Sequence, residues 1–134
     1  MESIDLSRIN YLAVVIAGVA HMAVGMIWFQ SRLFGNAWSE LTGKTLAPAV
    51  KWIPLAVVGH MTIAFVLAIL MVFASATTIL GGLVVAVLVW LGFVVTLEIG
   101  ELVWEKIPFK LFLIRIGNHL VALALAGIVL GALR

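Results

Sequence analysis

The sequence predicts an all-α integral membrane protein: a four-helix bundle with a short amphipathic helix at the membrane interface between the first and second spans. Two observations predict this class. Hydrophobic residues make up 65% of the chain and charged residues only 10%, whereas an ordinary soluble domain is about 25% charged. Four apolar segments are also long enough to cross a hydrocarbon core about 30 Å thick, for which about 20 helical residues suffice.

Composition also bounds the domain organisation and the function classes. With 134 residues the chain has the length of one domain, and we treat residues 1–134 as a single transmembrane domain. The net charge of +2 is small and the basic residues are scattered, which argues against a nucleic-acid partner. Because there is no cysteine, disulfides, thiolate metal sites and cysteine nucleophiles are excluded. Glu2 and Asp5 stand where a cleaved signal peptide would be basic.

The four predicted spans are apolar runs bounded by signals for helix starts and ends. They cover approximately residues 9–29, 54–74, 79–104 and 109–133. Helices are expected because an open strand would leave backbone groups unsatisfied in lipid. Pro54 and Pro108 lie where the first turn of a helix needs no amide donor. Ser75, Thr77 and Thr78 supply a tight turn and an N-cap between the second and third spans.

The longest loop contains the predicted interfacial helix, over approximately residues 32–42. Its apolar residues fall on one helical face and consist of Leu33, Phe34, Ala37, Trp38 and Leu41. Gly43 is placed to end this helix. An amphipathic helix of this kind lies at the membrane surface. It could serve as an anchor, or as a lid over whatever the bundle binds.

Basic and aromatic residues predict the orientation. The first and third loops carry Arg32, Lys44, Lys51, Lys106 and Lys110, whereas the opposite side carries only Arg8 and Arg134. Because cytoplasmic loops are enriched in Lys and Arg, we expect these two loops in the cytoplasm and both termini outside. Aromatic residues are expected to mark the membrane interface on the loop side, namely Trp28, Phe34, Trp38, Trp52 and Trp104.

Polar and ionisable residues inside the spans are the candidates for a functional site, because such residues usually face a bundle interior or a cavity. At 1.5 Å per residue, they lie roughly 5–15 Å from the loop-side interface. All four spans contribute to this layer, which consists of His21, His60, Glu98, Glu101, Arg115, Asn118 and His119. We predict that these residues bind a substrate or ion. No catalytic residue is assigned.

Helical spacing supports a common layer but leaves the third span ambiguous. Arg115, Asn118 and His119 share one face of the fourth span at i, i+3 and i+4. Glu98 and Glu101 share a face of the third. A stripe of small residues on the third span (Gly92, Thr96 and Gly100) points largely away from Glu98, so two faces of that span could pack.

The same residues also have a purely structural interpretation. Residues 79–97 could be the part of the third span that occupies the hydrocarbon core. In that case Glu98 and Glu101 lie among the lipid headgroups, and the Arg115 side chain extends toward the membrane surface. Glu98 and Arg115 are then an ion pair that joins the third span to the fourth. His21 lies inside the first span under either placement.

Three functional hypotheses follow. The first is transport of an ion, proton or small cation by the carboxylates and histidines. The second is a non-catalytic structural or accessory subunit of a larger membrane complex. Because one small bundle encloses little of a pathway by itself, we expect a homo-oligomer or a membrane complex. Membrane lipid is also an expected partner. The third is a metal-dependent enzyme that uses the histidines and carboxylates as ligands. Neither HExxH nor ExxH is present and no nucleophile–base pair is visible, so an enzyme is the less favoured class and the cofactor and metal stay open.

Several short motifs carry a family resemblance. They are Trp28-Phe29, LFGNAW at 33–38, WLGF at 90–93, Trp104-Glu105 and LFLI at 111–114. The sequence resembles domain-of-unknown-function family 1761 over nearly the whole chain. The resemblance implies a small four-helix protein of the bacterial inner membrane and no assigned activity. Arg115 stands where an uncharged polar residue is more usual in this family, so a site built on Arg115 is expected to be particular to this protein.

Overall fold

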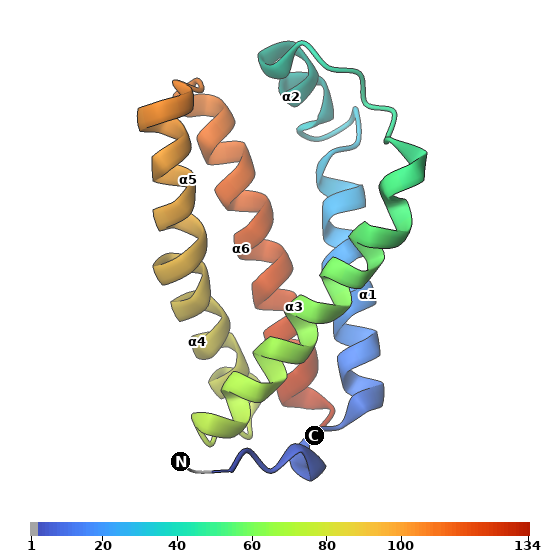
Figure 1. The fold of residues 1–134 in the computed structure, drawn as a ribbon, viewed down its shortest axis with the longest axis vertical. Coiled ribbons are helices and arrows are strands. Elements are labelled where there is room, and N and C mark those ends of the chain that lie inside the picture. Colours follow the sequence, from blue (N-terminus) through green and yellow to red (C-terminus); the bar gives the residue numbers. More distant parts are fainter. Residues whose placement is uncertain (1–2) are drawn as a thin grey trace.

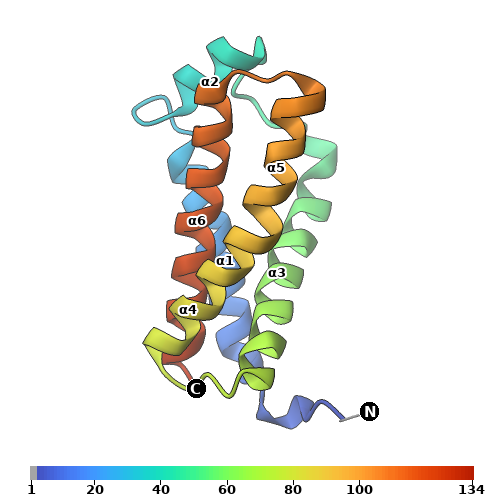
Figure 2. The ribbon, with the colours of Figure 1, turned by 90° about the vertical axis from the view of Figure 1, so that its left-hand side faces the viewer.

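The computed structural model describes residues 3–134 as an elongated bundle of four long helices (Figure 1). Its α-helices are α1 (Tyr11–Trp28), α2 (Gly35–Thr42), α3 (Ile53–Phe73), α4 (Ile79–Val89), α5 (Thr96–Gly100) and α6 (Phe109–Ala132). Four stretches are long and apolar enough to cross a membrane: Tyr11–Trp28, Val50–Phe73, Ile79–Glu105 and Phe109–Ala132. The predicted fold class is confirmed. Helix α2 covers one end of the bundle, and the chain ends lie at the other (Figure 2).

Local signals fix where the spans begin and end. The Asn10 side chain accepts a hydrogen bond from the amide of Ala13 at 3.2 Å and so caps α1. Thr78 caps α4 in the same way, accepting from the amide of Gly81 at 3.0 Å. Pro108 is the N-cap residue of α6. The predicted spans therefore agree with the observed helices to within a turn.

The third span departs from a regular α-helix. Two π-helical segments, η3 (Trp90–Val95) and η4 (Glu101–Glu105), flank the short α5. The Thr96 hydroxyl donates a hydrogen bond to the Gly92 carbonyl at 2.6 Å. Because a π-turn holds more residues than an α-turn, it changes which side chains share a face. Glu98 faces α6, whereas no described heavy atom lies within 4 Å of a Cβ built on Gly92 or Gly100. The face with Glu98 packs inside the protein, and the small-residue stripe does not.

The predicted start of the interfacial helix at residue 32 is wrong, because α2 begins at Gly35. The chain before it forms turns in which the amide of Phe34 donates to the Trp28 carbonyl at 3.0 Å and that of Gly35 to the Gln30 carbonyl at 2.9 Å. A Cβ at Gly35 would overlap the carbonyl of Phe29. This tight reversal needs glycine and leaves no room for a helical turn before it. The predicted end is confirmed, since Gly43 ends α2 with a φ of 69°.

Aromatic pairs hold α2 against the bundle. The rings of Trp28 and Phe34 stack with centroids 4.5 Å apart. The ring of Trp38, from α2 itself, meets Phe29 edge-on at 6.0 Å. Such pairs contribute about 0.5–1.5 kcal/mol beyond their buried area. They fix α2 across the end of α1.

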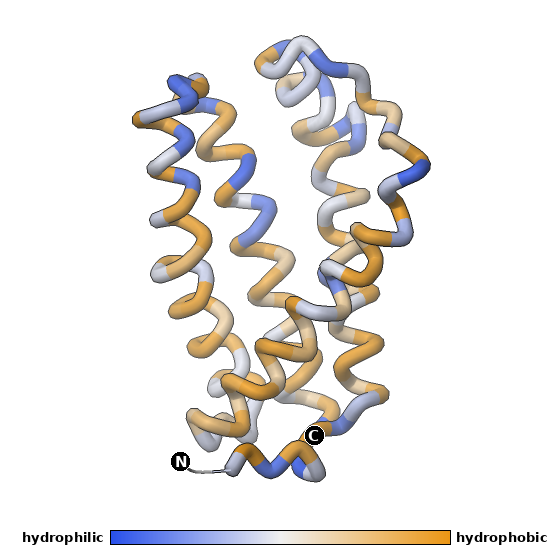
Figure 3. The backbone as a smooth tube through the Cα atoms, viewed as in Figure 1, coloured by the Kyte–Doolittle hydropathy of each residue, from blue (hydrophilic) through white to orange (hydrophobic). Residues whose placement is uncertain are grey.

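The helices pack most tightly in the half away from α2. The carbonyl of Gly127 in α6 occupies the space that a Cβ on Gly82 in α4 would need, and the reverse also holds. Two of the largest fully buried side chains, Leu67 and Met71, lie in this half on α3. Figure 3 shows this half as almost continuously hydrophobic, whereas the hydrophilic positions within the spans gather toward α2. The hydrophilic residues within the spans therefore lie mainly in the α2 half.

Candidate functional site

A pair of histidines joins α1 to α3 inside the bundle. Nδ1 of His21 lies 2.8 Å from Nδ1 of His60, and the two rings are tilted by 52°. His21 is 4% exposed and His60 is half-exposed. Gly18 lies at the close crossing, because a Cβ there would lie only 3.3 Å from the backbone Cα of Met61. Glycine one turn before His21 thus lets α3 approach near enough for the two imidazoles to hydrogen-bond.

His21 also faces a cavity of about 340 Å³. The cavity lies between α3 on one side and α4, η3 and α6 on the other, with His21 of α1 at its inner wall. Its lining comprises His21, Thr62, Ile63, Val66, Leu67, Leu70, Val89, Val94, His119 and Leu123. Two of its lining residues on α3 are exposed, Ile63 at 37% and Val66 at 46%.

The second ring nitrogen of His21 has no partner. Among residues 3–134, the buried side-chain nitrogen and oxygen atoms that lack a hydrogen-bond partner are His21 Nε2, Glu98 Oε2 and Asn118 Oδ1. The Thr62 hydroxyl, a polar neighbour on the cavity wall, already donates to the Val58 carbonyl at 2.8 Å. Buried polar atoms in folded proteins nearly always have a partner. His21 Nε2 is the most deeply buried exception here.

A second polar group links α5 to α6. Nη1 of Arg115 lies 3.7 Å from Oε2 of Glu98, and this is the single ion pair in the described part of the chain. The side chains are 31% and 19% exposed. A separation of 3.7 Å is too long for a hydrogen bond, so the carboxylate oxygen keeps hydrogen-bonding capacity. The structural interpretation of this pair, as a connection between the third and fourth spans, matches this arrangement.

Two tryptophans hold α6 beside Arg115. Nε1 of Trp28 donates to the Ile114 carbonyl at 3.1 Å, and Nε1 of Trp90 donates to the Ile116 carbonyl at 2.8 Å. The first comes from α1 and the second from η3, so the indoles reach α6 from different helices. The sequence pointed to Trp28 only as an interface residue and did not point to Trp90. A buried tryptophan needs a hydrogen-bond partner for its indole N–H. The presence of tryptophans within the spans was therefore the signal that could have identified both contacts.

The remaining predicted residues are less closely joined. The Asn118 side-chain oxygen points toward α1 at Gly25, where a built Cβ would lie 3.9 Å away. Glu101 is half-buried at the start of η4 and forms no ion pair with any residue between 3 and 134. The predicted layer thus divides into the cavity with its histidines and the Glu98–Arg115 pair. The predicted interface aromatics all lie at or near the α2 end, and these are Trp28, Phe34, Trp38, Trp52 and Trp104.

The histidines and carboxylates do not form a metal-binding cluster. Within the described range 3–134, no three side chains of His, Asp or Glu are placed to hold one metal ion. Catalytic zinc takes three protein ligands. His21 and His60 moreover use their Nδ1 atoms to contact each other. The geometry therefore gives the metal-dependent enzyme hypothesis no support.

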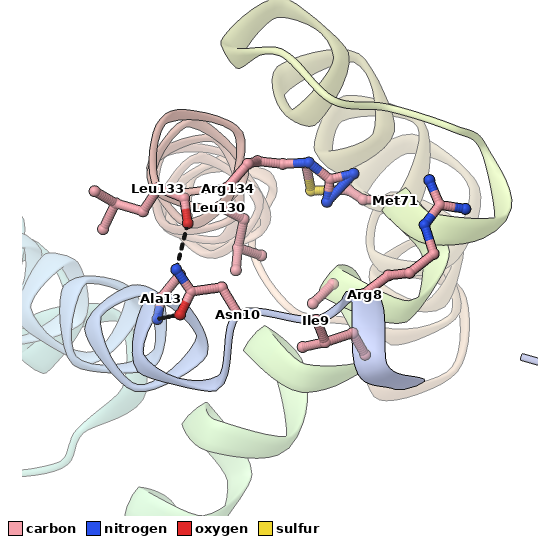
Figure 4. Close-up of a pocket in the computed structure, with 9 residues that line it drawn as sticks. Arg8, Ile9, Asn10, Ala13, Met71, Leu130, Leu133 and Arg134 are labelled. Carbon is pink, nitrogen blue, oxygen red and sulfur yellow. Dashed lines mark hydrogen bonds between the residues drawn. The ribbon is translucent and has the colours of Figure 1, made fainter. Parts of the chain in front are cut away.

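A second, much smaller cavity lies at the opposite end (Figure 4). Its volume is about 20 Å³, and Arg8, Asn10, Met71 and Arg134 contribute to its lining. Asn10 donates from Nδ2 to the Leu133 carbonyl at 2.6 Å and so ties the start of α1 to the end of α6. This volume holds about one water molecule. The cavity is a packing gap between the two chain ends, too small for a ligand.

The four apolar spans and their buried polar groups define a small multi-pass membrane protein. The chain belongs to the family described as protein of unknown function (DUF1761), whose model matches residues 12–131. The match runs from the first span to the last and confirms the resemblance seen in the sequence. Comparisons with curated proteins and with solved structures give no match. Since the family description assigns no activity, a function has to be argued from the site.

Proposed function

We propose that the protein binds a small amphipathic molecule that enters the cavity sideways from the bilayer. The observation that carries this proposal is a cavity of about 340 Å³ whose lining is apolar except for His21, Thr62 and His119, with exposed lining residues on α3. A polar atom in a low-dielectric interior is costly without a partner. A ligand with one polar group and an apolar body would match this lining and fill the cavity.

The volume and the length of the cavity limit which ligands it could hold. Ligand pockets typically measure about 300–1,000 Å³, so about 340 Å³ suits a molecule with one short or medium chain. The α3 wall extends from Thr62 to Leu70, a length of about 12 Å at 1.5 Å per residue. Thr62 and His119 lie at the end toward α2. The polar group of the ligand would sit at that end and its apolar chain would extend away from α2.

Water alone is a poor occupant of this cavity. An ordered buried water makes about two to four hydrogen bonds, and the lining offers few polar groups besides His21 and His119. Moving the apolar body of a ligand from the bilayer into the cavity gains little free energy, because lipid tails are as apolar as the cavity wall. Selectivity would therefore come from hydrogen bonding of the ligand's polar group at the end of the cavity that holds Thr62 and His119, because a hydrogen bond is stronger in a low dielectric than in water.

A matched pair of tryptophan substitutions tests the cavity. Val66→Trp places an indole in it and is expected to reduce labelling by a photoreactive decanol analogue in liposomes by about tenfold. Val121→Trp is the control, because Val121 is 43% exposed, close to the 46% of Val66, but does not line the cavity. Equal labelling of both variants and the parent protein would refute binding at this site.

Transport of a proton or small cation is a second candidate. It is favoured by the buried Glu98 Oε2, which lacks a hydrogen-bond partner within residues 3–134. One copy offers no route between α4 and α6 in the half away from α2, however, because these helices are in backbone contact at Gly82 and Gly127. This candidate therefore requires a second copy or a partner subunit, which purification in a mild detergent would reveal. Its decisive variant is described in the Discussion.

We also propose that the α2 end faces the cytoplasm of a bacterial cell, on the basis of five basic loop residues against two at the other end. The absence of cysteine makes single-cysteine labelling clean. In intact spheroplasts, a membrane-impermeant maleimide is expected to label Thr77→Cys at once and Glu40→Cys only after lysis. Labelling in the reverse order would invert the proposed orientation.

A further inference from the structure

We propose that the α2 end of the bundle binds the headgroups of anionic phospholipids through its exposed basic side chains. This proposal does not depend on the cavity. Five exposed basic residues lie at the α2 end, between the turns that precede α2 and the first turn of α6 (Figure 1). We call them the basic surface, and they are Arg32, Lys44, Lys51, Lys106 and Lys110. At a membrane surface, basic residues of this kind attract lipid headgroups that carry a net negative charge.

The charges of the basic surface are not neutralised by carboxylates of the described chain. Within residues 3–134 the single ion pair joins Arg115 to Glu98, so none of the five basic side chains is paired there. The other carboxylates at the α2 end belong to Glu40, Glu101 and Glu105. Five basic side chains against these three acidic ones give the α2 end a net positive charge. Its charge therefore complements an anionic headgroup.

Exposed tryptophans place two of the lysines at the level of the lipid headgroups. Trp52 and Trp104 are 57% and 82% exposed, and tryptophans in membrane proteins concentrate at the headgroup level. Nζ of Lys51 lies 5.3 Å from the centroid of the Trp52 ring. A cation over an aromatic face keeps its charge, so this ammonium group is held at the depth where lipid phosphates lie. Lys106 follows Trp104 by two residues and lies at a similar depth.

The backbone at Lys106 is a separate reason to assign a role to its side chain. Lys106 is the C-cap residue of η4 and adopts a left-handed conformation with a φ of 54°. Glycine adopts this conformation without the steric cost that a side chain adds. Glycine would therefore suit the turn into α6 better than lysine does. A lysine here keeps a cation at the end of the span although the backbone favours a residue without a side chain.

Two lipids with identical chains test the proposal. The protein in detergent micelles is titrated with dioctanoyl phosphatidylglycerol, which is anionic, or with dioctanoyl phosphatidylcholine, which has no net charge. Native mass spectrometry then gives the affinity for each lipid. Phosphatidylglycerol is expected to bind about 5- to 25-fold more tightly, as one or two engaged lysines imply. Raising the salt concentration should reduce this preference, because salt screens exposed charges.

Lys106→Gly separates lipid binding from folding. The free energy of unfolding is expected to stay the same or to rise, because the left-handed conformation suits glycine. The preference for phosphatidylglycerol is expected to fall about fivefold with the loss of one cation. Lys51→Gln should lower the preference by a similar factor. Lys51→Arg keeps the charge and should retain the preference.

Arg134→Gln is the matched control, because it removes one exposed positive charge at the opposite end of the bundle. It is expected to leave the preference for phosphatidylglycerol unchanged. Equal affinity of the parent protein for the two lipids would overturn the proposal. A preference that survives both Lys51→Gln and Lys106→Gly, or that Arg134→Gln lowers as much as they do, would also overturn it.

Discussion

Replacing Gly127 with valine is expected to destabilise the protein by more than about 3 kcal/mol, because overpacking here meets rigid backbone instead of a side chain that can move. The Gly82 carbonyl occupies the position that the new Cβ needs. In a bilayer, helices associate through close packing and not through exclusion of water, so a forced separation of α4 and α6 has little to offset it. The measurement is the free energy of unfolding in mixed micelles.

The control for this prediction lies on the same span as Gly82. Gly92→Val introduces the same side chain where no described heavy atom lies within 4 Å of the built Cβ. Its expected effect is within about 1 kcal/mol, the range of helix propensity differences. Comparable losses in Gly92→Val and Gly127→Val would mean that the contact of α4 with α6 does not stabilise the fold.

Arg115→Leu is expected to destabilise the protein by about 2–3 kcal/mol. Removing one partner of a buried ion pair costs about 3–5 kcal/mol, and we reduce this because the two side chains are 31% and 19% exposed. The loss arises because the Glu98 carboxylate is left without a countercharge inside the span. The double variant Glu98→Leu, Arg115→Leu should recover most of the stability. A double variant as unstable as the single one would show that Arg115 acts through packing.

The same pair separates a structural role from transport. If Glu98 carries a proton or small cation, Glu98→Gln should abolish flux in proteoliposomes while the protein stays folded. Glu105→Gln is the control, since Glu105 is exposed at the end of η4. Unchanged flux in Glu98→Gln would eliminate transport through this residue and leave Glu98 as one half of a structural ion pair.

Features set by neighbouring residues were predictable from the sequence. Thr78 caps α4, Pro108 precedes α6 and Gly43 ends α2 in a left-handed conformation, and each follows from local backbone chemistry. The position of the polar residues toward the α2 end was predictable for a similar reason, because position along a helix fixes height along the bundle. The pairing of Glu98 with Arg115 followed from their common depth on consecutive spans.

Features set by tertiary contact were not predictable. The late start of α2 depends on the fit of Gly35 against the carbonyl of Phe29, which residue spacing does not reveal. The π-helical segments of the third span do not follow from residue spacing, and within residues 3–134 Glu98 forms an ion pair whereas Glu101 forms none. The contact between His21 and His60 depends on which helices are neighbours, and one sequence does not give that information.

The most direct test of the account is to map where the photoreactive decanol analogue attaches, by mass spectrometry of labelled protein from liposomes. Binding in the cavity predicts labels concentrated on the α3 face from Ile63 to Leu70 and on Leu123 of α6. Leu97 and Val121 are exposed to lipid, at 74% and 43%, and lie outside the cavity. Labels spread as densely over Leu97 and Val121 as over the cavity wall would contradict the account.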